Sequence, residues 1–223
     1  MIDLEEGMKD LIVLGASGFA KEVAWLVERI NSCSKQWNLL GFIDEDKSTA
    51  GRVIGGYRVL GTSEVAKEYP KAQYICAIGS SQIRQKAISK ILTYLPEAQF
   101  ATLIDPSVMI SKRVKVGGGS IICAGTIITV DIDIGDHVIV NLDCTIGHDA
   151  IIKDYVTIYP SVNISGNTLI ENGVELGTGT QIIQGKKIGE GTIVGAGAVV
   201  VKDLPAHCTA VGAPAKPIKF FEK

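Results

Sequence analysis

The hydrophobic and polar positions of this chain follow two different periods. In the first half, short apolar runs alternate with stretches in which an apolar residue recurs every three or four positions, the spacing of one helix face. Such an alternation of strands and helices predicts a small parallel sheet. The expected elements are strands over 10–14, 39–43 and 74–78, helices over 19–31 and about 82–93, and a turn at Gly15–Gly18.

In the second half, an aliphatic residue recurs at every sixth position without a break. Neither an α-helix nor a plain alternating strand has this period, which is typical of a short straight side followed by a turn. The repeated positions are Ile104, Ile110, Val116, Ile122, Ile128, Ile134, Val140, Ile146, Ile152, Ile158, Ile164, Ile170, Leu176, Ile182, Ile188, Val194 and Val200.

Small residues fill much of the rest of each repeat. The position four residues after each aliphatic one is small or β-branched, apart from Lys186, and glycine often follows the aliphatic residue directly. Glycine tolerates the backbone angles of a corner. Three six-residue sides make a triangular coil, and each coil would hydrogen-bond to the next at a spacing of about 4.8 Å. Residues 104–201 are therefore predicted to form a parallel β-helix.

The composition supports a boundary near residue 103. The chain is 46% hydrophobic but only 6% aromatic, and it contains 25 glycines. Only two aromatic residues, Tyr155 and Tyr159, lie in 104–201, a segment rich in Ile, Val and Gly. A narrow β-helix interior accommodates stacked β-branched side chains and few aromatic rings, so the unusual composition agrees with the predicted fold.

Charge and cysteine content exclude several classes of protein. The net charge of −2 argues against broad binding to nucleic acid or to a membrane surface, and no apolar run approaches the length of a membrane span. The acidic start, MIDLEEGMKD, lacks the apolar core of a signal peptide. Five cysteines without a CxxC pair indicate reduced thiols, so we expect a cytoplasmic protein.

Histidine is the side chain that most often serves as a general base, and the chain offers few of them. There are three histidines, His137, His148 and His207. His148 follows the inward Ile146 by two positions, which places it at a corner, pointing outward. Gly166 comes one full coil of three sides later, so it should stack beside His148.

The two halves together resemble a known family. The register of 104–201 is similar to the left-handed β-helix of hexapeptide-repeat acyltransferases. Ahead of it, the Gly15–Gly18 turn, the Gly41-Phe42-Ile43-Asp44 strand end and the Ala77-Ile78-Gly79 segment followed by Arg84 resemble the sialic-acid and bacillosamine acetyltransferase branch. The resemblance implies a Rossmann-like α/β domain followed by a left-handed parallel β-helix, and a homotrimer. It also implies acetyl-CoA as co-substrate, with no metal.

The resemblance also suggests roles for particular residues. The base of that branch is a histidine followed by an acidic residue, matched here by His148-Asp149, and its oxyanion contact falls at a glycine matched by Gly166. Asn141 and Asp149 match positions that orient the histidine or contact the sugar. Residues 131–154, with six aspartates and one lysine, could form an anionic pocket for an ammonium substrate or simply a solvated face.

The C-terminal end carries the features expected of a coenzyme A site. Gly195 and Ala196 allow close approach of a pantetheine arm, and the loop around Pro214 resembles the family's closing loop. Basic side chains that could neighbour the phosphates are Lys186, Lys202 and Lys216.

The first half offers a candidate nucleotide site. The Gly15–Gly18 turn is half of a dinucleotide fingerprint and lacks the full GxGxxG motif. Backbone amides at a strand-to-helix turn suit a pyrophosphate, and Asp44 could accept hydrogen bonds from a ribose or a base. With the resemblance, a nucleotide-diphosphate sugar is favoured over NAD. Candidate substrate-binding residues are Gly15, Ser17, Gly18, Asp44, Ala77 and Gly79.

The predicted organisation is a nucleotide-sugar-binding domain over 1–103, the β-helix over 104–205 and a closing tail over 206–223. The leading functional hypothesis is N-acetylation of a nucleotide-linked amino-deoxy sugar, of the UDP-4-amino type, with His148 as general base. O-acetylation of sialic acid or a related sugar is the alternative. A non-catalytic nucleotide-sugar-binding protein, with the first domain acting only as a cap, stays open. A zinc hydratase is disfavoured, because the histidines are not at coil multiples.

Overall fold

The computed structural model describes residues 7–221. The chain forms two compact units, one of Met1–Ile78 with Lys86–Ala101 and one of Gly79–Gln85 with Thr102–Lys223. The short segment Gly79–Gln85 therefore groups with the C-terminal unit, whereas the sequence predicted one continuous first domain. The first six residues of the acidic start, and the last two of the predicted tail, lie outside the described residues.

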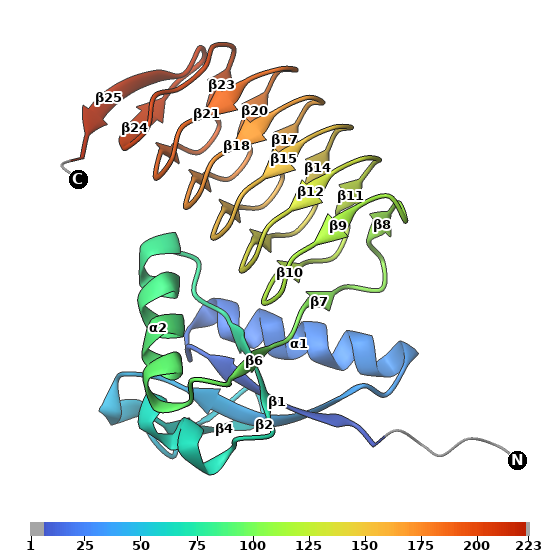
Figure 1. The fold of residues 1–223 in the computed structure, drawn as a ribbon, viewed down its shortest axis with the longest axis vertical. Helices are drawn as coiled ribbons and strands as arrows, with labels where there is room; N and C mark the ends of the chain where they lie inside the picture. Colours follow the sequence, from blue (N-terminus) through green and yellow to red (C-terminus); the bar gives the residue numbers. More distant parts are fainter. Residues whose placement is uncertain (1–6, 222–223) are drawn as a thin grey trace, which may run out of the picture. The chain divides into compact units, whose positions relative to one another are not determined.

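The N-terminal unit is a mostly parallel sheet flanked by helices (Figure 1). Its strands run in the order β3-β4-β2-β1-β5-β6. Strand β1 pairs in parallel with β2 and β5, as the alternating pattern predicted. The elements are β1 (Lys9–Leu14), α1 (Gly18–Cys33), β2 (Trp37–Ile43), β3 (Val53–Ile54), β4 (Tyr57–Gly61), β5 (Gln73–Cys76), α2 (Ser81–Tyr94) and β6 (Gln99–Phe100), with short 3₁₀ turns at Lys47–Thr49 and Ser63–Glu68.

A small hairpin at the sheet edge was not predicted. Strands β3 and β4 pair antiparallel around Gly55 and Gly56, whose φ angles are 55° and 86°. Two consecutive positive φ angles are the geometry of a tight hairpin turn, which glycine pairs favour. The Gly-Gly dipeptide was the available signal, but two-residue strand β3 is too short to show an alternating pattern.

The C-terminal unit is a β-helix of two-residue strands on three faces (Figure 1). The first face holds β7 (Leu103–Ile104), β10 (Ile121–Ile122), β13 (Ile139–Val140), β16 (Thr157–Ile158), β19 (Glu175–Leu176) and β22 (Ile193–Val194). The second face holds β8 (Met109–Ile110), β11 (Ile127–Ile128), β14 (Thr145–Ile146), β17 (Asn163–Ile164), β20 (Gln181–Ile182) and β23 (Val199–Val200). The third face holds β9 (Lys115–Val116), β12 (Asp133–Ile134), β15 (Ile151–Ile152), β18 (Leu169–Ile170) and β21 (Lys187–Ile188).

Each strand on these faces pairs in parallel with its equivalent in the neighbouring coil, so the six-residue register is the register of the fold. Ile128, for example, pairs with Ile110 and with Ile146. The repeated aliphatic side chains stack in the interior and are buried from Ile122 onward. Ile104, Ile110 and Val116 are only partly buried, since they belong to the first coil and have no coil before them. This confirms the predicted fold class.

The predicted tail extends the first face. Strand β24 (Cys208–Val211) pairs in parallel with β22, and β25 (Lys216–Phe220) returns antiparallel to β24. The parallel ladder therefore continues past residue 205, where the sequence placed the end of the β-helix. Within residues 7–221, no helix has the length and apolar character required to cross a bilayer.

Candidate active site

The sequence of each coil places particular residues at three corners, which we name by the faces they join. The first corner follows the first-face strands, the second corner follows the second-face strands, and the third corner follows the third-face strands. Residues separated by one full coil of three sides occupy the same corner in successive coils. Side chains at some corner positions are exposed, among them His148 and Asp149, so a site can form there.

His148 and Asp149 form a hydrogen-bonded pair at the second corner, directly after β14. His148 Nδ1 lies 2.7 Å from Asp149 Oδ2, and about half of each side chain is exposed. Asp149 has a φ of 59°, and its N–H donates to Val130 O at 3.2 Å, which ties it to the preceding coil. When the neutral ring donates its Nδ1 proton to Asp149, Nε2 carries the lone pair and can accept a proton.

Gly166 stacks against the His148 ring, one coil further on, as the repeat predicted. A Cβ at this glycine would lie 2.6 Å from His148 Nε2 and 2.7 Å from Cε1. Only a residue without a side chain leaves the ring its observed position. Among residues 7–221, no group accepts a hydrogen bond from the Gly166 N–H. Gly166 is buried, so its N–H is an unpaired buried donor next to the imidazole.

The structure does not bring Asn141 to this pair. Asn141 follows β13 and lies at the first corner, while His148 lies at the second corner of the same coil. Its Oδ1 accepts from Leu142 N at 2.8 Å, and among the described residues its Nδ2 donates to no group. Gly195 and Ala196 follow β22, so they share the first corner with Asn141. The predicted site residues are thus divided between two corners of one chain.

The basic candidates near the C-terminal end differ in position. Lys202 follows β23 and lies in the same second-corner column as His148 and Gly166. Lys202, Pro214 and Lys216 are exposed, whereas Lys186 is half-buried. At the first corner, a Cβ on Gly195 would lie 2.7 Å from Val211 Cγ1, so the predicted glycine allows β24 to pack closely.

In the N-terminal unit, Asp44 holds the glycine turn. Its Oδ2 accepts from Ala16 N at 2.8 Å, and its Oδ1 accepts from Asp46 N at 2.9 Å. Gly15 has a φ of 98°, and Ser17 and Gly18 lie at the start of α1, where both are exposed. Gly15 N donates to Ile43 O at 2.8 Å, so among the described residues only the Ser17 and Gly18 amides of the turn have no acceptor, and Asp44 fixes the shape of the turn.

The remaining predicted substrate residues, Ala77 and Gly79, are not part of this turn. Ala77 is fully buried, with its carbonyl against Gly15, so it packs under the turn and offers no side chain to a ligand. Gly79 belongs to the C-terminal unit, where its carbonyl accepts hydrogen bonds from Arg84 Nη1 and Thr157 Oγ1.

Arg84 is the main structural residue to which the sequence assigned no role. It is fully buried in the C-terminal unit, where its guanidinium donates to His137 O at 3.0 Å, Tyr155 O at 2.7 Å and Thr157 Oγ1 at 2.9 Å. These bonds fasten Gly79–Gln85 onto the β-helix. The only signal in the sequence was its position shortly after Gly79.

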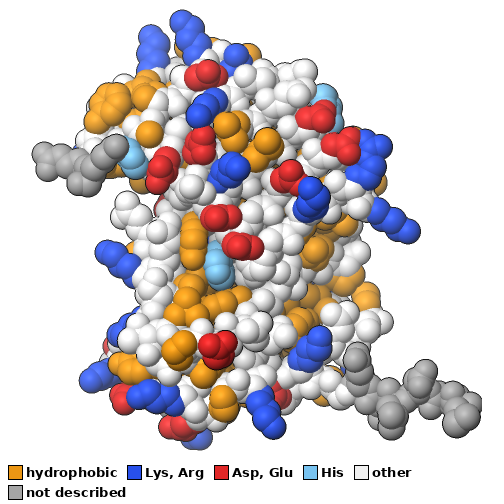
Figure 2. Space-filling view, in the orientation of Figure 1, with side chains coloured by type: hydrophobic (Ala, Val, Ile, Leu, Met, Phe, Trp, Pro, Cys, Tyr) orange, Lys and Arg blue, Asp and Glu red, His pale blue; other side chains and the backbone are white. Residues whose placement is uncertain are grey.

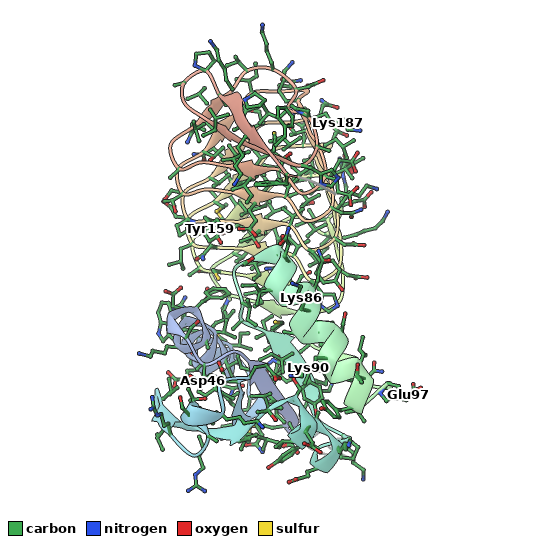
Figure 3. All side chains as sticks on the ribbon, turned by 90° about the vertical axis from the view of Figure 1, so that its left-hand side faces the viewer. Asp46, Lys86, Lys90, Glu97, Tyr159 and Lys187 are labelled. Carbon is green, nitrogen blue, oxygen red and sulfur yellow. The ribbon has the colours of Figure 1, made fainter. Side chains whose placement is uncertain are left out.

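A second contact to the same segment runs through Tyr159, whose place on the β-helix is labelled in Figure 3. Its hydroxyl lies 3.3 Å from Glu175 Oε2, and Glu175 Oε1 accepts from Ser81 N at 2.8 Å. Burial, followed by the neighbouring charge of Glu175, raises the pKa of Tyr159. The phenol therefore stays protonated and serves as a donor.

The rings of the other two histidines, His137 and His207, pack against neighbouring protein groups. The His137 ring stacks on Tyr155, with ring centroids 5.0 Å apart, and burial lowers its pKa. A Cβ on Gly119 would meet the His137 ring far inside contact distance, and one on Gly191 would lie 2.9 Å from His207 Nδ1. Both rings therefore fill space left by a glycine in the preceding coil.

The six aspartates of 131–154 do not form one anionic pocket. They lie at all three corners and on the third face, and several have individual partners. Asp133 pairs with Lys115 at 3.2 Å, and Asp136 and Asp154 accept from backbone N–H groups of the preceding coil. On the face shown in Figure 2, acidic and basic side chains are interspersed. This favours the solvated-face interpretation that the sequence left open.

Similarity to known proteins extends over nearly the whole chain. A model of the PglD N-terminal domain matches residues 10–91. WeeI from Acinetobacter baumannii is 33% identical, with 95% of this chain and 100% of that chain covered and a TM-score of 0.82. The chain belongs to the hexapeptide-repeat acetyltransferase family.

Two further solved structures resemble this acetyltransferase. One is the acetyltransferase domain of PglB from Neisseria gonorrhoeae with acetyl coenzyme A, at 31% identity, TM-score 0.84, and coverage of 95% of this chain and 100% of that one. The other is a variant of perosamine N-acetyltransferase from Caulobacter crescentus in which one histidine is replaced by asparagine, in complex with CoA and GDP-perosamine. It is 29% identical, with a TM-score of 0.85 and coverage of 98% of this chain and 100% of that one.

One further match covers only a short part of the chain. A Schizosaccharomyces pombe protein whose name places it among acetyltransferases is 60% identical over 30 residues, which is 14% of either chain. Across residues 7–221 of the acetyltransferase, no three His, Cys, Asp or Glu side chains are grouped as a metal centre would require.

Proposed function

We propose that this protein is an acetyl-CoA-dependent N-acetyltransferase acting on an amino-deoxy sugar linked to a nucleoside diphosphate. The observation that carries the proposal is the His148–Asp149 pair beside Gly166, whose N–H has no acceptor among the described residues. It occurs in a chain that is similar along its whole length to sugar N-acetyltransferases.

The proposed chemistry assigns one task to each group. His148 Nε2 accepts the proton of the attacking amine as its nitrogen bonds to the thioester carbonyl, and Asp149 stabilises the resulting imidazolium. The Gly166 N–H donates to the carbonyl oxygen as it gains negative charge. When the carbon–sulfur bond breaks, the imidazolium returns a proton to the thiolate. Two structures of the perosamine enzyme carry a replacement of one histidine, by Asn or by Ala, which supports a histidine at such a site.

Two surfaces are proposed to bind the substrates. The Ser17 and Gly18 amides of the turn, whose shape Asp44 holds through Ala16 N, would take the pyrophosphate of the nucleotide sugar. The second-corner column from Gly166 towards Lys202 would carry the pantetheine arm, with the phosphates near Lys202 and Lys216. Cys33, Cys144 and Cys208 are free thiols, as expected for the cytoplasm, where we locate the enzyme.

A homotrimer would unite the two corners. The second face lies between the first and second corners, so three copies that turn this face to a common axis place the second corner of each beside the first corner of the next. Exposed apolar side chains on this face, Met109 and Ile127, support such packing. His148 of one copy would then work with Asn141 of another.

This arrangement predicts complementation between inactive variants. His148→Ala and Asn141→Ala should each be impaired alone. A doubly tagged, purified mixed trimer of the two variants should recover about one third of wild-type activity, because every such trimer contains one intact pair of corners out of three. A site within one chain would leave the mixture inactive. As a control, His148→Ala mixed with Gly166→Ala should not recover, since those residues share one corner.

The decisive experiment is a thiol-release screen. Purified protein is mixed with acetyl-CoA and a panel of UDP-, GDP- and TDP-linked amino sugars, together with the matching 4-hydroxy sugars and free sialic acid. We expect thiol release with one class of nucleotide-linked amino sugar and an amide product by mass spectrometry. Release only with hydroxyl acceptors would replace N-acetylation by O-acetylation, and no release with any acceptor would refute the proposal.

A further inference from the structure

A column of charged residues lies beneath the His148–Asp149 pair. Arg113, Asp131 and Asp149 occupy the same position of the second corner in three successive coils. Asp131 and Asp149 share the same backbone conformation, with φ angles of 57° and 59°. Their side chains therefore leave the corner in the same direction, about one coil spacing of 4.8 Å apart.

Arg113 binds both oxygens of Asp131. Its Nε lies 2.8 Å from Asp131 Oδ1, and Nη2 contacts Oδ2. A guanidinium matches a carboxylate in this two-point arrangement, which also fixes the direction of the carboxylate. The hydrogen bond and the charge of Asp131 raise the pKa of Arg113, and the charge of Asp149 acts in the same sense. Arg113 thus lies within electrostatic reach of both carboxylates.

The Arg113–Asp131 ion pair affects whether the Asp149 carboxylate stays on His148. Without Arg113, the unpaired Asp131 would repel the Asp149 carboxylate from one coil below. Without Asp131, Arg113 would be free to attract that carboxylate away from the imidazole. With both present the two charges cancel, and Asp149 is left to accept from His148 Nδ1 at 2.7 Å.

We propose that Arg113 and Asp131 are positioning residues that keep Asp149 on His148, and so keep the His148 lone pair at Nε2. The inference rests on the proposed function of the His148–Asp149 pair. This positioning role differs from a general stabilising role. It requires the charges of Arg113 and Asp131 to balance each other, so removing both side-chain charges together should do little harm.

A double-mutant cycle tests this balance. Arg113→Gln and Asp131→Asn should each lower kcat about threefold to tenfold, the change expected for one uncompensated charge at coil spacing in water. The KM values for acetyl-CoA and for the sugar should stay unchanged. The double variant, Arg113→Gln with Asp131→Asn, should return close to wild type. A double variant as impaired as the product of the singles would overturn the proposal.

Salt dependence provides a second kinetic readout. Exposed charges are screened over about 10 Å at 0.1 M salt, so the deficit of each single variant should shrink as NaCl rises towards about 0.5 M. A deficit that is independent of salt would indicate a packing defect and contradict the electrostatic role.

The third face supplies a matched control. Lys115 and Asp133 form an ion pair of 3.2 Å in the same two coils, but the next residue in their column is Ile151. Lys115→Gln removes the same charge from the same coil, and we expect no change in kcat. An equal loss in this variant would show that net charge, and not the second-corner column, is responsible.

A readout without turnover separates this inference from the proposed function. Side-chain nitrogen NMR of the three histidines, with His148 assigned from the His148→Ala spectrum, reports which ring nitrogen carries the proton. Wild type and the double variant should show His148 mainly protonated at Nδ1, and each single variant should gain the Nε2–H form. Unchanged tautomers in the single variants would refute the positioning role, even if no acetyl acceptor is found.

Discussion

Replacing His148 with alanine should lower kcat by about 10²–10⁴-fold, the usual contribution of a general base. The variant loses the group at this corner that accepts the proton of the attacking amine, while the Gly166 N–H and both substrate surfaces stay in place. KM for acetyl-CoA should therefore change little. Thiol release under saturating substrates, with the acceptor found in the screen, measures the effect.

Folding controls make this result interpretable. The His148 side chain is about half exposed and belongs to a corner, so its removal should leave the melting temperature and the oligomeric state unchanged. His207→Ala is the matched control, because it removes another corner imidazole that packs against a glycine away from the second corner. Near-normal turnover by His148→Ala, or an equal loss in His207→Ala, would exclude His148 as the base.

Gly166→Ala should lower kcat roughly tenfold to a hundredfold, the range expected when a catalytic group is displaced by about 1 Å. The added Cβ would lie 2.6 Å from His148 Nε2, which is closer than atoms can approach, so the ring must turn away. The same methyl group would occupy the space beside the open N–H. Steady-state kinetics combined with a melting curve would separate this local effect from a loss of fold.

Gly118→Ala is the control for this substitution. Gly118 holds the same position in its six-residue repeat, but a Cβ there would meet only Asp136 Oδ1, at an ordinary 3.8 Å. Both alanine variants change backbone freedom equally, and only one places a methyl group against the imidazole. Similar activity in the two variants would mean that the His148 ring can turn away from the added methyl group without loss of activity.

The six-residue register allowed much of the β-helix to be predicted from sequence. Its interior holds the repeated aliphatic side chain of each face and the small residue four positions later, so these positions define the strands, the corners and the pairing of residues between neighbouring coils. For this reason Gly166 could be placed against His148 without coordinates. In the N-terminal half, the three expected strands and two expected helices were predicted within a few residues, for example Lys9–Leu14 for the expected 10–14, whereas β3, β4 and β6 were not predicted.

Other features could not be predicted because they depend on contacts between distant segments. In the sequence, Arg84 is only one polar residue in a helical pattern. Its role comes from the hydrogen bonds of its guanidinium to the carbonyls of His137 and Tyr155, which lie far along the chain. The hairpin of β3 and β4 depends on a single pair of glycines. The six aspartates of 131–154 look like one charged cluster in sequence, but the coil distributes them over three corners and a face.

The sequence by itself determined the repeat, the coil length, and the stacking of Gly166 on His148, because a strict period fixes which residues share a corner. The tertiary structure decided which side chains meet. It pairs His148 with Asp149 and places Asn141 at another corner, and it joins Arg113 to Asp131 below the site. A period states only the column in which a side chain stands, whereas rotamers, hydrogen bonds and neighbouring charges decide what that side chain contacts.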